Sequence, residues 1–121
     1  MTFDRRRFVG SGVAAAVMAA CGPAVWAQGR GPIKIGAFGP MSGNAATQGQ
    51  SVRESVEMVA KIKNAAGGIG GRQIEVVIGD DAGKPEEAAV VARRFATRDN
   101  VTIAIGSVSS PASLAAAQVF R

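Results

Sequence analysis

Residues 73–95 read QIEVVIGDDAGKPEEAAVVARRF, which is a short apolar run, a turn and a longer amphipathic segment. The run from 73 to 79 is rich in β-branched residues, which favour strands. Asp80, Asp81 and Gly83 are of the types that turns favour. Pro85 then suits the first position of a helix, where its missing N–H would have no helical partner. The segment therefore predicts a strand, a turn and a helix in that order.

The helix expected to begin at Pro85 carries charges that suit its dipole. Glu86 and Glu87 lie near its positive end, and basic side chains follow near its negative end. Its apolar residues recur at helical spacing. We therefore expect one buried face, formed by Ala88, Val91, Ala92 and Phe95.

A similar strand and helix precede this segment. Residues 33–38 (IKIGAF) predict a strand, and residues 39–49 predict a loop. A helix is expected from Ser51 to Ala66, because apolar residues recur there at helical period. Gly67 and Gly68 end it, since glycine supplies the left-handed conformation of a helix C-cap. The expected buried face of this helix consists of Val52, Val56, Val59 and Ile62.

A third strand and a third helix follow. Residues 101–105 (VTIAI) are almost wholly apolar, as expected of a strand covered on both faces. Ser110 and Pro111 open a helix that runs through Leu114, Ala117 and Phe120. Strands that alternate with helices predict an α/β fold, with a parallel sheet, right-handed crossovers and flanking helices.

Length and charge limit the function. The chain has 121 residues, so it holds at most one small domain of about 100–200 residues. It ends in or just after a helix with no closing strand, and we expect it to be the N-terminal part of a larger protein. Without residues 1–27 there remain 11 basic and 8 acidic side chains, a net charge of +3. Nothing in this balance calls for a nucleic acid as partner.

Residues 1–27 have the features of an export signal. Arg5, Arg6 and Arg7 form a positive region, residues 8–20 are apolar or small, and residues 25–27 (VWA) offer a cleavage site. The apolar part falls short of the roughly 20 residues of a membrane span, so a permanent anchor is the less favoured alternative. Residues 5–9 (RRRFV) resemble the twin-arginine export consensus, with an ordinary secretory signal as the alternative. Residues 28–121 are therefore expected to be the mature, periplasmic part.

Cys21 is the only cysteine, so no intrachain disulfide can form. Residues 18–22 (MAACG) resemble a lipoprotein box, and lipidation of Cys21 would tether the protein to a membrane. The favoured alternative is that Cys21 is removed with the signal. The mature chain then has no thiol for redox chemistry or for thiolate metal sites.

Ligands of open parallel sheets bind beyond the carboxyl ends of the strands. The loop after residue 38 does not match the dinucleotide pattern G-x-G-x-x-G, and Pro40 lacks an N–H donor. The loop of residues 106–111 (GSVSSP) places serines at the start of a helix, where free N–H groups attract anions. A carboxylate there would accept hydrogen bonds from Ser109, Ser110 and backbone amides. The alternative is that a serine only caps the helix.

Catalysis finds little support in the sequence. The chain has no His and no Tyr, and it lacks the G-x-S-x-G nucleophile elbow. Asp80 and Asp81 are expected to cap their turn or to pair with basic side chains, with a carboxylate pair or a metal site as the alternative. We therefore expect no enzyme and no cofactor.

Four stretches together resemble a known family. They are residues 33–36 (IKIG) leading to 40–43 (PMSG), residues 64–71 (NAAGGIGG), residues 80–81 (DD) followed by Pro85 and Ala88, and residues 105–110 (IGSVSS). In this order and spacing, behind an export signal, they resemble the extracytoplasmic solute-binding proteins of branched-chain amino-acid ABC transporters, the leucine/isoleucine/valine-binding type. The resemblance runs from Ile33 to Phe120.

The resemblance implies a type I periplasmic-binding fold, in which two lobes close on a ligand. Residues 28–121 would be the first half of the N-terminal lobe. Ser110 would help to hold the α-carboxylate of an amino acid, which agrees with the helix-terminus reasoning. Gln48 would lie in a loop near the ligand, where relatives often have an aromatic residue, and its polarity speaks against a simple aliphatic pocket.

The implied function is a non-enzymatic receptor. It would capture a branched-chain amino acid or a similar small carboxylate-bearing solute and deliver it to the membrane permease of an ABC importer. The alternative is a ligand-sensing module that presents a small amide or aromatic acid to a membrane receptor. The remaining ligand contacts would come from other parts of the two lobes, so residues 28–121 alone are expected to bind nothing tightly.

Overall fold

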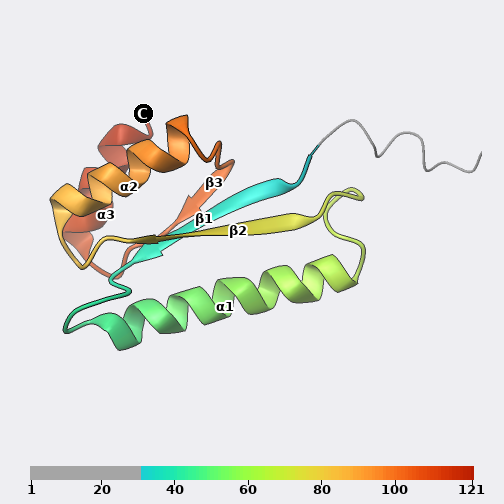
Figure 1. Ribbon diagram of the computed structural model, residues 1–121, viewed down its shortest axis with the longest axis horizontal. Coiled ribbons are helices and arrows are strands. Elements are labelled where there is room, and N and C mark those ends of the chain that lie inside the picture. Colours follow the sequence, from blue (N-terminus) through green and yellow to red (C-terminus); the bar gives the residue numbers. More distant parts are fainter. Residues whose placement is uncertain (1–30) are drawn as a thin grey trace, which may run out of the picture.

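The computed structural model describes residues 31–121, in which strands and helices alternate (Figure 1). The expected export signal and Cys21 lie outside these residues. The elements are β1 (Ile33–Gly39), α1 (Ala46–Ala65), β2 (Ile74–Asp80), α2 (Pro85–Thr97), β3 (Ile103–Ile105) and α3 (Ser110–Val119). This order confirms the α/β fold expected from the sequence. In residues 31–121 no helix has the length and apolar character to cross a membrane.

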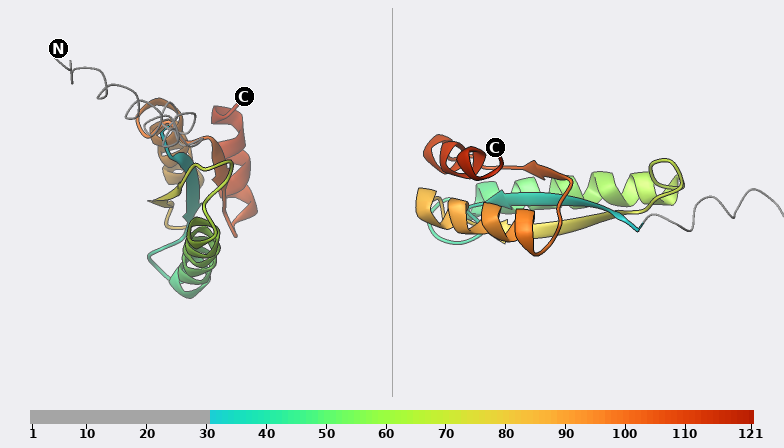
Figure 2. Two further views of the ribbon diagram at one scale, coloured as in Figure 1. Left: turned by 90° about the vertical axis from the view of Figure 1, so that its right-hand side faces the viewer. Right: turned by 90° about the horizontal axis from the view of Figure 1, so that it is seen from above.

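The three strands form one parallel sheet in the order β2-β1-β3. β1 lies in the centre, because it pairs with β2 along its whole length and with β3 over residues 35–37. α1 covers one face of the sheet, and α2 and α3 lie together on the other (Figures 1 and 2). All three strands therefore end at the same edge, as the predicted crossovers require.

The core lies between the sheet and the α2–α3 pair. The Phe95 side chain is fully buried, and its ring packs edge-on against Phe38 at a centroid distance of 6.4 Å and an angle of 79°. Gly36 makes room for this ring, because a Cβ there would lie 2.5 Å from Phe95 Cε2. The predicted buried face of α2 is confirmed in full. The buried cluster consists of Phe38, Ala88, Val91, Ala92, Phe95, Ala112 and Ala116.

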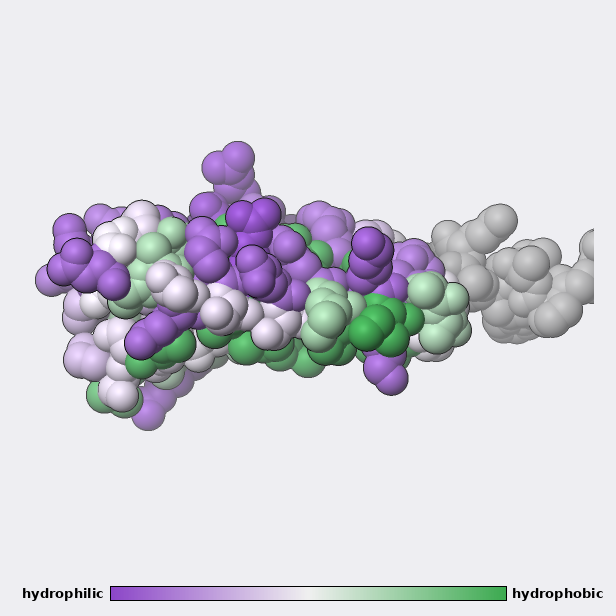
Figure 3. Space-filling view, turned by 90° about the horizontal axis from the view of Figure 1, so that it is seen from below, coloured by the Kyte–Doolittle hydropathy of each residue, from purple (hydrophilic) through white to green (hydrophobic). Residues whose placement is uncertain are grey.

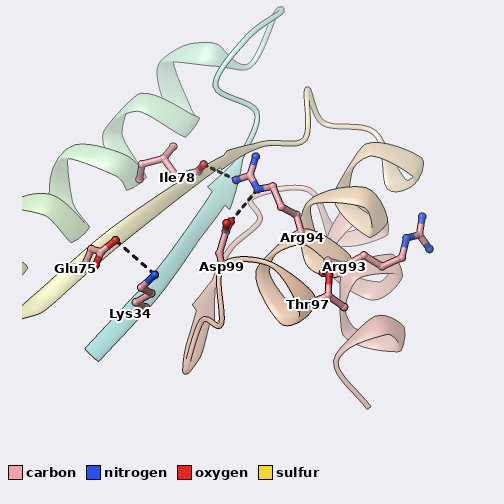
Figure 4. A network of polar contacts seen from close by, with 7 residues as sticks. All are labelled: Lys34, Glu75, Ile78, Arg93, Arg94, Thr97 and Asp99. Carbon is pink, nitrogen blue, oxygen red and sulfur yellow. Dashed lines mark hydrogen bonds and ion pairs between the residues drawn. The ribbon is translucent and has the colours of Figure 1, made fainter. Parts of the chain in front are cut away.

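Arg94 ties the end of α2 to the sheet (Figure 4). Its Nε lies 3.0 Å from Asp99 Oδ2, and its Nη2 donates to the Ile78 carbonyl at 2.9 Å. The guanidinium also lies 5.3 Å from the centroid of the Phe95 ring, within the range of a cation–π contact. The polar end of Arg94 thus closes the apolar core around Phe95.

α1 begins at Ala46, five residues before the predicted start at Ser51. Gly49, predicted to lie in a loop, is a buried helical residue in close contact with the Pro40 backbone. Helix and loop approach so closely there that a Cβ would overlap the Pro40 carbonyl. The glycine marks a close approach of two segments, and the loop after β1 is correspondingly shorter.

The predicted apolar face of α1 is only partly covered. Val52 and Val56 are half-buried, whereas Val59 and Ile62 are 51% and 59% exposed. α1 packs on β1 and β2 and leaves the side of β3 open. Figure 3 shows apolar residues gathered along one side of the α1 surface. A groove of about 250 Å³ runs there, lined by Ile35, Ser55, Val56, Val59, Ala60, Ile74 and Ile105.

β3 is shorter than predicted, and its expected coverage on both faces is wrong. It comprises three residues, of which Ile103 and Ile105 are 57% and 43% exposed. Ala104 points to the other face and packs on the core cluster. β3 lies at the edge of the sheet, and no helix in residues 31–121 covers the α1 side of this strand.

The buried face of α3 does not pass through its larger apolar residues. Ala112 and Ala116 are buried, whereas Leu114 is 68% exposed and Phe120 is 42% exposed. Two alanines four residues apart form a narrow stripe that lets α3 pack closely on α2. α3 is apolar on most of its surface, so periodicity did not identify the face that packs.

Candidate functional site

Three loops meet at the carboxyl edge of the sheet. They comprise residues 40–45 after β1, residues 81–84 after β2, and residues 106–109 after β3. Because the strands are parallel, their arrowheads point to one end of the molecule (Figure 1). This edge is where open α/β sheets bind ligands.

Asp80 joins the first two of these loops. Its Oδ1 accepts hydrogen bonds from the Met41 N–H and the Ala82 N–H, both at 2.9 Å. Desolvation raises the pKa of Asp80, but hydrogen bonds from the Ser42 hydroxyl and from the backbone of Ala82, Met41 and Ser42 outweigh it and lower the pKa below 3.8. The ionised carboxylate is therefore the form that holds the loop after β1.

Asp81 supports the turn from inside the protein. Its side chain is fully buried, and its Oδ1 accepts a hydrogen bond from the Gly83 N–H at 2.8 Å. Its own N–H donates to the Gly39 carbonyl at 3.0 Å. Oδ2 has no hydrogen-bond partner among residues 31–121. The two aspartates cap their turn, as the favoured prediction states, and neither pairs with a basic side chain in the described part of the chain.

We expect Asp80→Asn to lower the free energy of unfolding by about 1 kcal/mol at pH 7, because the charge-assisted bonds to the loop weaken. A carboxylate with a lowered folded-state pKa stabilises the fold above its unfolded pKa, near 3.8, and this contribution is lost as the pH falls through the folded pKa. Urea midpoints measured from pH 7 to pH 3 should therefore converge for wild type and D80N.

Glu54→Gln is the matched control for this experiment. Glu54 is exposed, and it makes no ion pair or side-chain hydrogen bond within residues 31–121. The E54Q protein should follow the wild-type curve to within about 0.5 kcal/mol at every pH. A D80N effect of equal size at pH 7 and pH 3 would contradict the role given to the ionised carboxylate.

The third loop leaves two serine hydroxyls free. Ser109 is the N-cap residue of α3, but its side chain makes no capping hydrogen bond. Neither the Ser109 nor the Ser110 hydroxyl has a hydrogen-bond partner within residues 31–121. Ser110 is exposed at the first position of the helix, and Ser109 is half-buried beside it. The alternative that one of these serines only caps the helix is therefore wrong.

Gln48 is not in a loop, contrary to the expectation. It is an exposed residue in the first turn of α1, because the helix starts at Ala46. α1 and α3 lie on opposite faces of the sheet (Figure 1). Both helices begin at the carboxyl edge, so the three residues share this edge from opposite faces of the sheet.

Ser113, which lies one turn inside α3, was not among the predicted site residues. The Ser113 hydroxyl accepts a hydrogen bond from the Ser107 N–H at 2.9 Å and donates one to the Ser107 carbonyl at 3.0 Å. A serine inside a helix usually bonds to the carbonyl four residues before it, so the sequence held no signal for this contact.

Comparisons with known proteins agree with this architecture. A family profile described as periplasmic binding protein matches residues 32–121. The Leu/Ile/Val-binding protein homolog 1 of Brucella abortus (strain 2308) is 36% identical over 115 residues, which are 95% of this chain and 30% of that protein. The chain thus spans about a third of the length of the curated relatives it matches.

Two solved structures share the fold. One is the branched-chain amino acid transporter substrate binding protein LivJ of Streptococcus pneumoniae in complex with isoleucine, at 36% identity and a TM-score of 0.70. The matched region covers 73% of this chain and 25% of the LivJ chain. The other is an ABC transporter solute binding protein of R. palustris in complex with benzoate, at 27% identity and a TM-score of 0.66. This match covers 75% of this chain and 25% of the R. palustris chain.

Proposed function

Because the chain belongs to the periplasmic binding protein family, we propose that it is part of the substrate-binding component of an ABC importer. Members of this family are solute-binding proteins, not enzymes. The component would capture a small carboxylate-bearing solute outside the cytoplasm and deliver it to a membrane permease. The observation that carries the proposal is the pair of free hydroxyls, Ser109 and Ser110, at the start of α3.

The start of α3 suits a carboxylate in its charge as well as in its donors. The first N–H groups of a helix have no partner within the helix, and the helix dipole places partial positive charge there. Residues 106–119 contain no Asp or Glu, so the loop and α3 have no side chain that would repel an anion. A carboxylate would accept bonds from the Ser109 and Ser110 hydroxyls and from backbone N–H groups.

What two similar proteins bind supports a proposal for the class of solute. The Streptococcus protein holds isoleucine, and the R. palustris protein holds benzoate. Both ligands carry a carboxylate next to an apolar group. We propose the same chemistry here, with a branched-chain amino acid as the first candidate and an aromatic acid as the second. Gln48, exposed at the same edge of the sheet, would add a polar contact near the solute.

The proposal includes a place in the cell. Residues 1–27 would be a twin-arginine export signal, and residues 28–121 would form part of the N-terminal lobe of a two-lobed periplasmic protein. The intact mass of the exported protein tests this arrangement. A mass several times that of residues 28–121 is expected, with Gln28 at the N-terminus for a free protein or lipidated Cys21 for a tethered one. A mass equal to residues 28–121 would contradict the two-lobed receptor.

We expect Ser110→Ala to weaken binding of the carboxylate about tenfold, because one charge-assisted hydrogen bond is lost. Calorimetric titration of the mature exported protein with L-leucine, L-isoleucine and benzoate measures this change. Ser55→Ala is the control, since Ser55 lies on α1 and its hydroxyl bonds to the Ser51 carbonyl. If S110A bound every solute as tightly as the wild type and S55A, the site would lie elsewhere.

A further inference from the structure

The loop between β3 and α3 is held from within the helix. The Ser113 hydroxyl bonds to both the N–H and the carbonyl of Ser107, and the Ser107 hydroxyl accepts from the Ser109 N–H at 3.3 Å. We propose that Ser113 is the positioning residue of the carboxylate site: it sets the shape of the loop and keeps the hydroxyls of Ser109 and Ser110 free for the solute. The proposal rests on the proposed function.

Other serines in the helices of this chain behave differently. In α1, the Ser51 hydroxyl bonds to the Thr47 carbonyl at 3.0 Å, and the Ser55 hydroxyl bonds to the Ser51 carbonyl at 2.8 Å. These are the usual bonds to the carbonyl four residues before. The Ser113 hydroxyl instead reaches back six residues, out of the helix. One side chain thus satisfies both backbone groups of Ser107, a residue beyond the end of β3.

The other end of the loop is anchored on the core. A Cβ on Gly106 would overlap the Phe38 carbonyl and lie 2.5 Å from Phe38 Cδ1, so the backbone passes directly over this buried side chain. The loop between β3 and α3 therefore has little conformational freedom, because Gly106 lies against Phe38 and Ser107 is bonded to Ser113. A loop that is ordered before binding loses less conformational entropy when the solute arrives.

Ser113 acts on the site without forming part of it. Its side chain and that of Ser107 are half-buried beneath the helix terminus, whereas Ser110 is exposed at the surface. Ser109 adopts an extended conformation, with φ −92° and ψ 115°, and its hydroxyl makes no bond to the first turn of α3. The helix terminus therefore keeps its partial positive charge available to an anion.

Two nearly isosteric variants test the role of the hydroxyl, Ser113→Thr and Ser113→Val, which differ only in this group. Calorimetry on the mature exported protein uses L-isoleucine and benzoate as carboxylate probes, and L-isoleucinamide and benzamide as probes without the charge. We expect S113V to bind the two carboxylates about tenfold more weakly than S113T, which should stay within about threefold of the wild type. Binding of the amides should differ less than about twofold between the variants.

A purely structural role would give another result. S113V would then melt at a lower temperature, and its affinity for acids and for amides would fall equally or would not fall at all. Either of these binding results would overturn the proposal. NMR relaxation of the Ser107 and Ser109 amides adds a readout that needs no solute. Greater mobility of these amides in S113V than in S113T supports the positioning role of Ser113, and equal mobility overturns it. Failure of the wild type to bind either carboxylate would contradict the proposed function itself. The carboxylate site that Ser113 is proposed to position would then be contradicted as well.

Discussion

Replacing Phe95 with Ala should lower the free energy of unfolding by about 3–5 kcal/mol, the usual cost of removing a buried aromatic ring. The ring is fully buried, packs edge-on against Phe38 and fills the space above Gly36. Because it lies between α2 and the central strand, its loss leaves a cavity that neither side can close. Arg94 would also lose the ring beneath its guanidinium.

Equilibrium unfolding in urea measures this effect, with Leu114→Ala as the control. Leu114 is 68% exposed on α3, so its truncation should change the free energy of unfolding by no more than about 0.5 kcal/mol. Small domains are stable by only about 5–15 kcal/mol, so the substitution should remove a large share of the stability. Equal midpoints for F95A and L114A would show that the core is not centred on Phe95.

Gly49→Ala should destabilise the protein by about 1–3 kcal/mol, the cost of overpacking. Alanine in place of a helical glycine ordinarily stabilises by about 1 kcal/mol, so the expected sign is reversed. The reason is the contact with Pro40: a Cβ at residue 49 would overlap the Pro40 carbonyl, and Pro40 is itself fully buried. The first turn of α1 would have to move away from the loop after β1.

Thermal unfolding of G49A and of Ser55→Ala separates the two effects. Ser55 is an exposed residue in the middle of the same helix, so S55A should gain the ordinary few tenths of a kcal/mol from helix propensity. G49A should melt below the wild type, and S55A at or above it. A G49A protein more stable than the wild type would mean that α1 and the loop do not approach as closely as described.

The agreement between sequence and structure is greatest where the signals are local. Every residue of the buried face of α2 was predicted correctly, because the apolar residues of this helix recur at helical spacing and include Phe95. The end of α1 was also predicted correctly, since Gly67 and Gly68 both have positive φ. The family resemblance is confirmed by the profile match over residues 32–121.

The candidate site was predicted only in part. The order of strand, loop and helix placed Ser109 and Ser110 at a helix terminus, and the structure keeps both there. The same reasoning left open whether a serine caps the helix, and in the structure neither the Ser109 nor the Ser110 hydroxyl makes a capping hydrogen bond. Gln48 was assigned to a loop because residues 39–49 were predicted as a loop and the resemblance placed it there, whereas α1 begins at Ala46 and includes both Gln48 and the buried Gly49.

The order of the strands and helices, the parallel sheet and the common edge of the three loops follow from short-range patterns: alternation, helical period and turn residues. The same short-range patterns do not determine which surfaces of these elements are buried. α1 starts early because Gly49 meets Pro40, α3 packs through Ala112 and Ala116, and Asp80 holds Met41 from 39 residues away. These contacts join residues that are distant in the chain, and their free energy depends on how the elements pack, which no local pattern encodes.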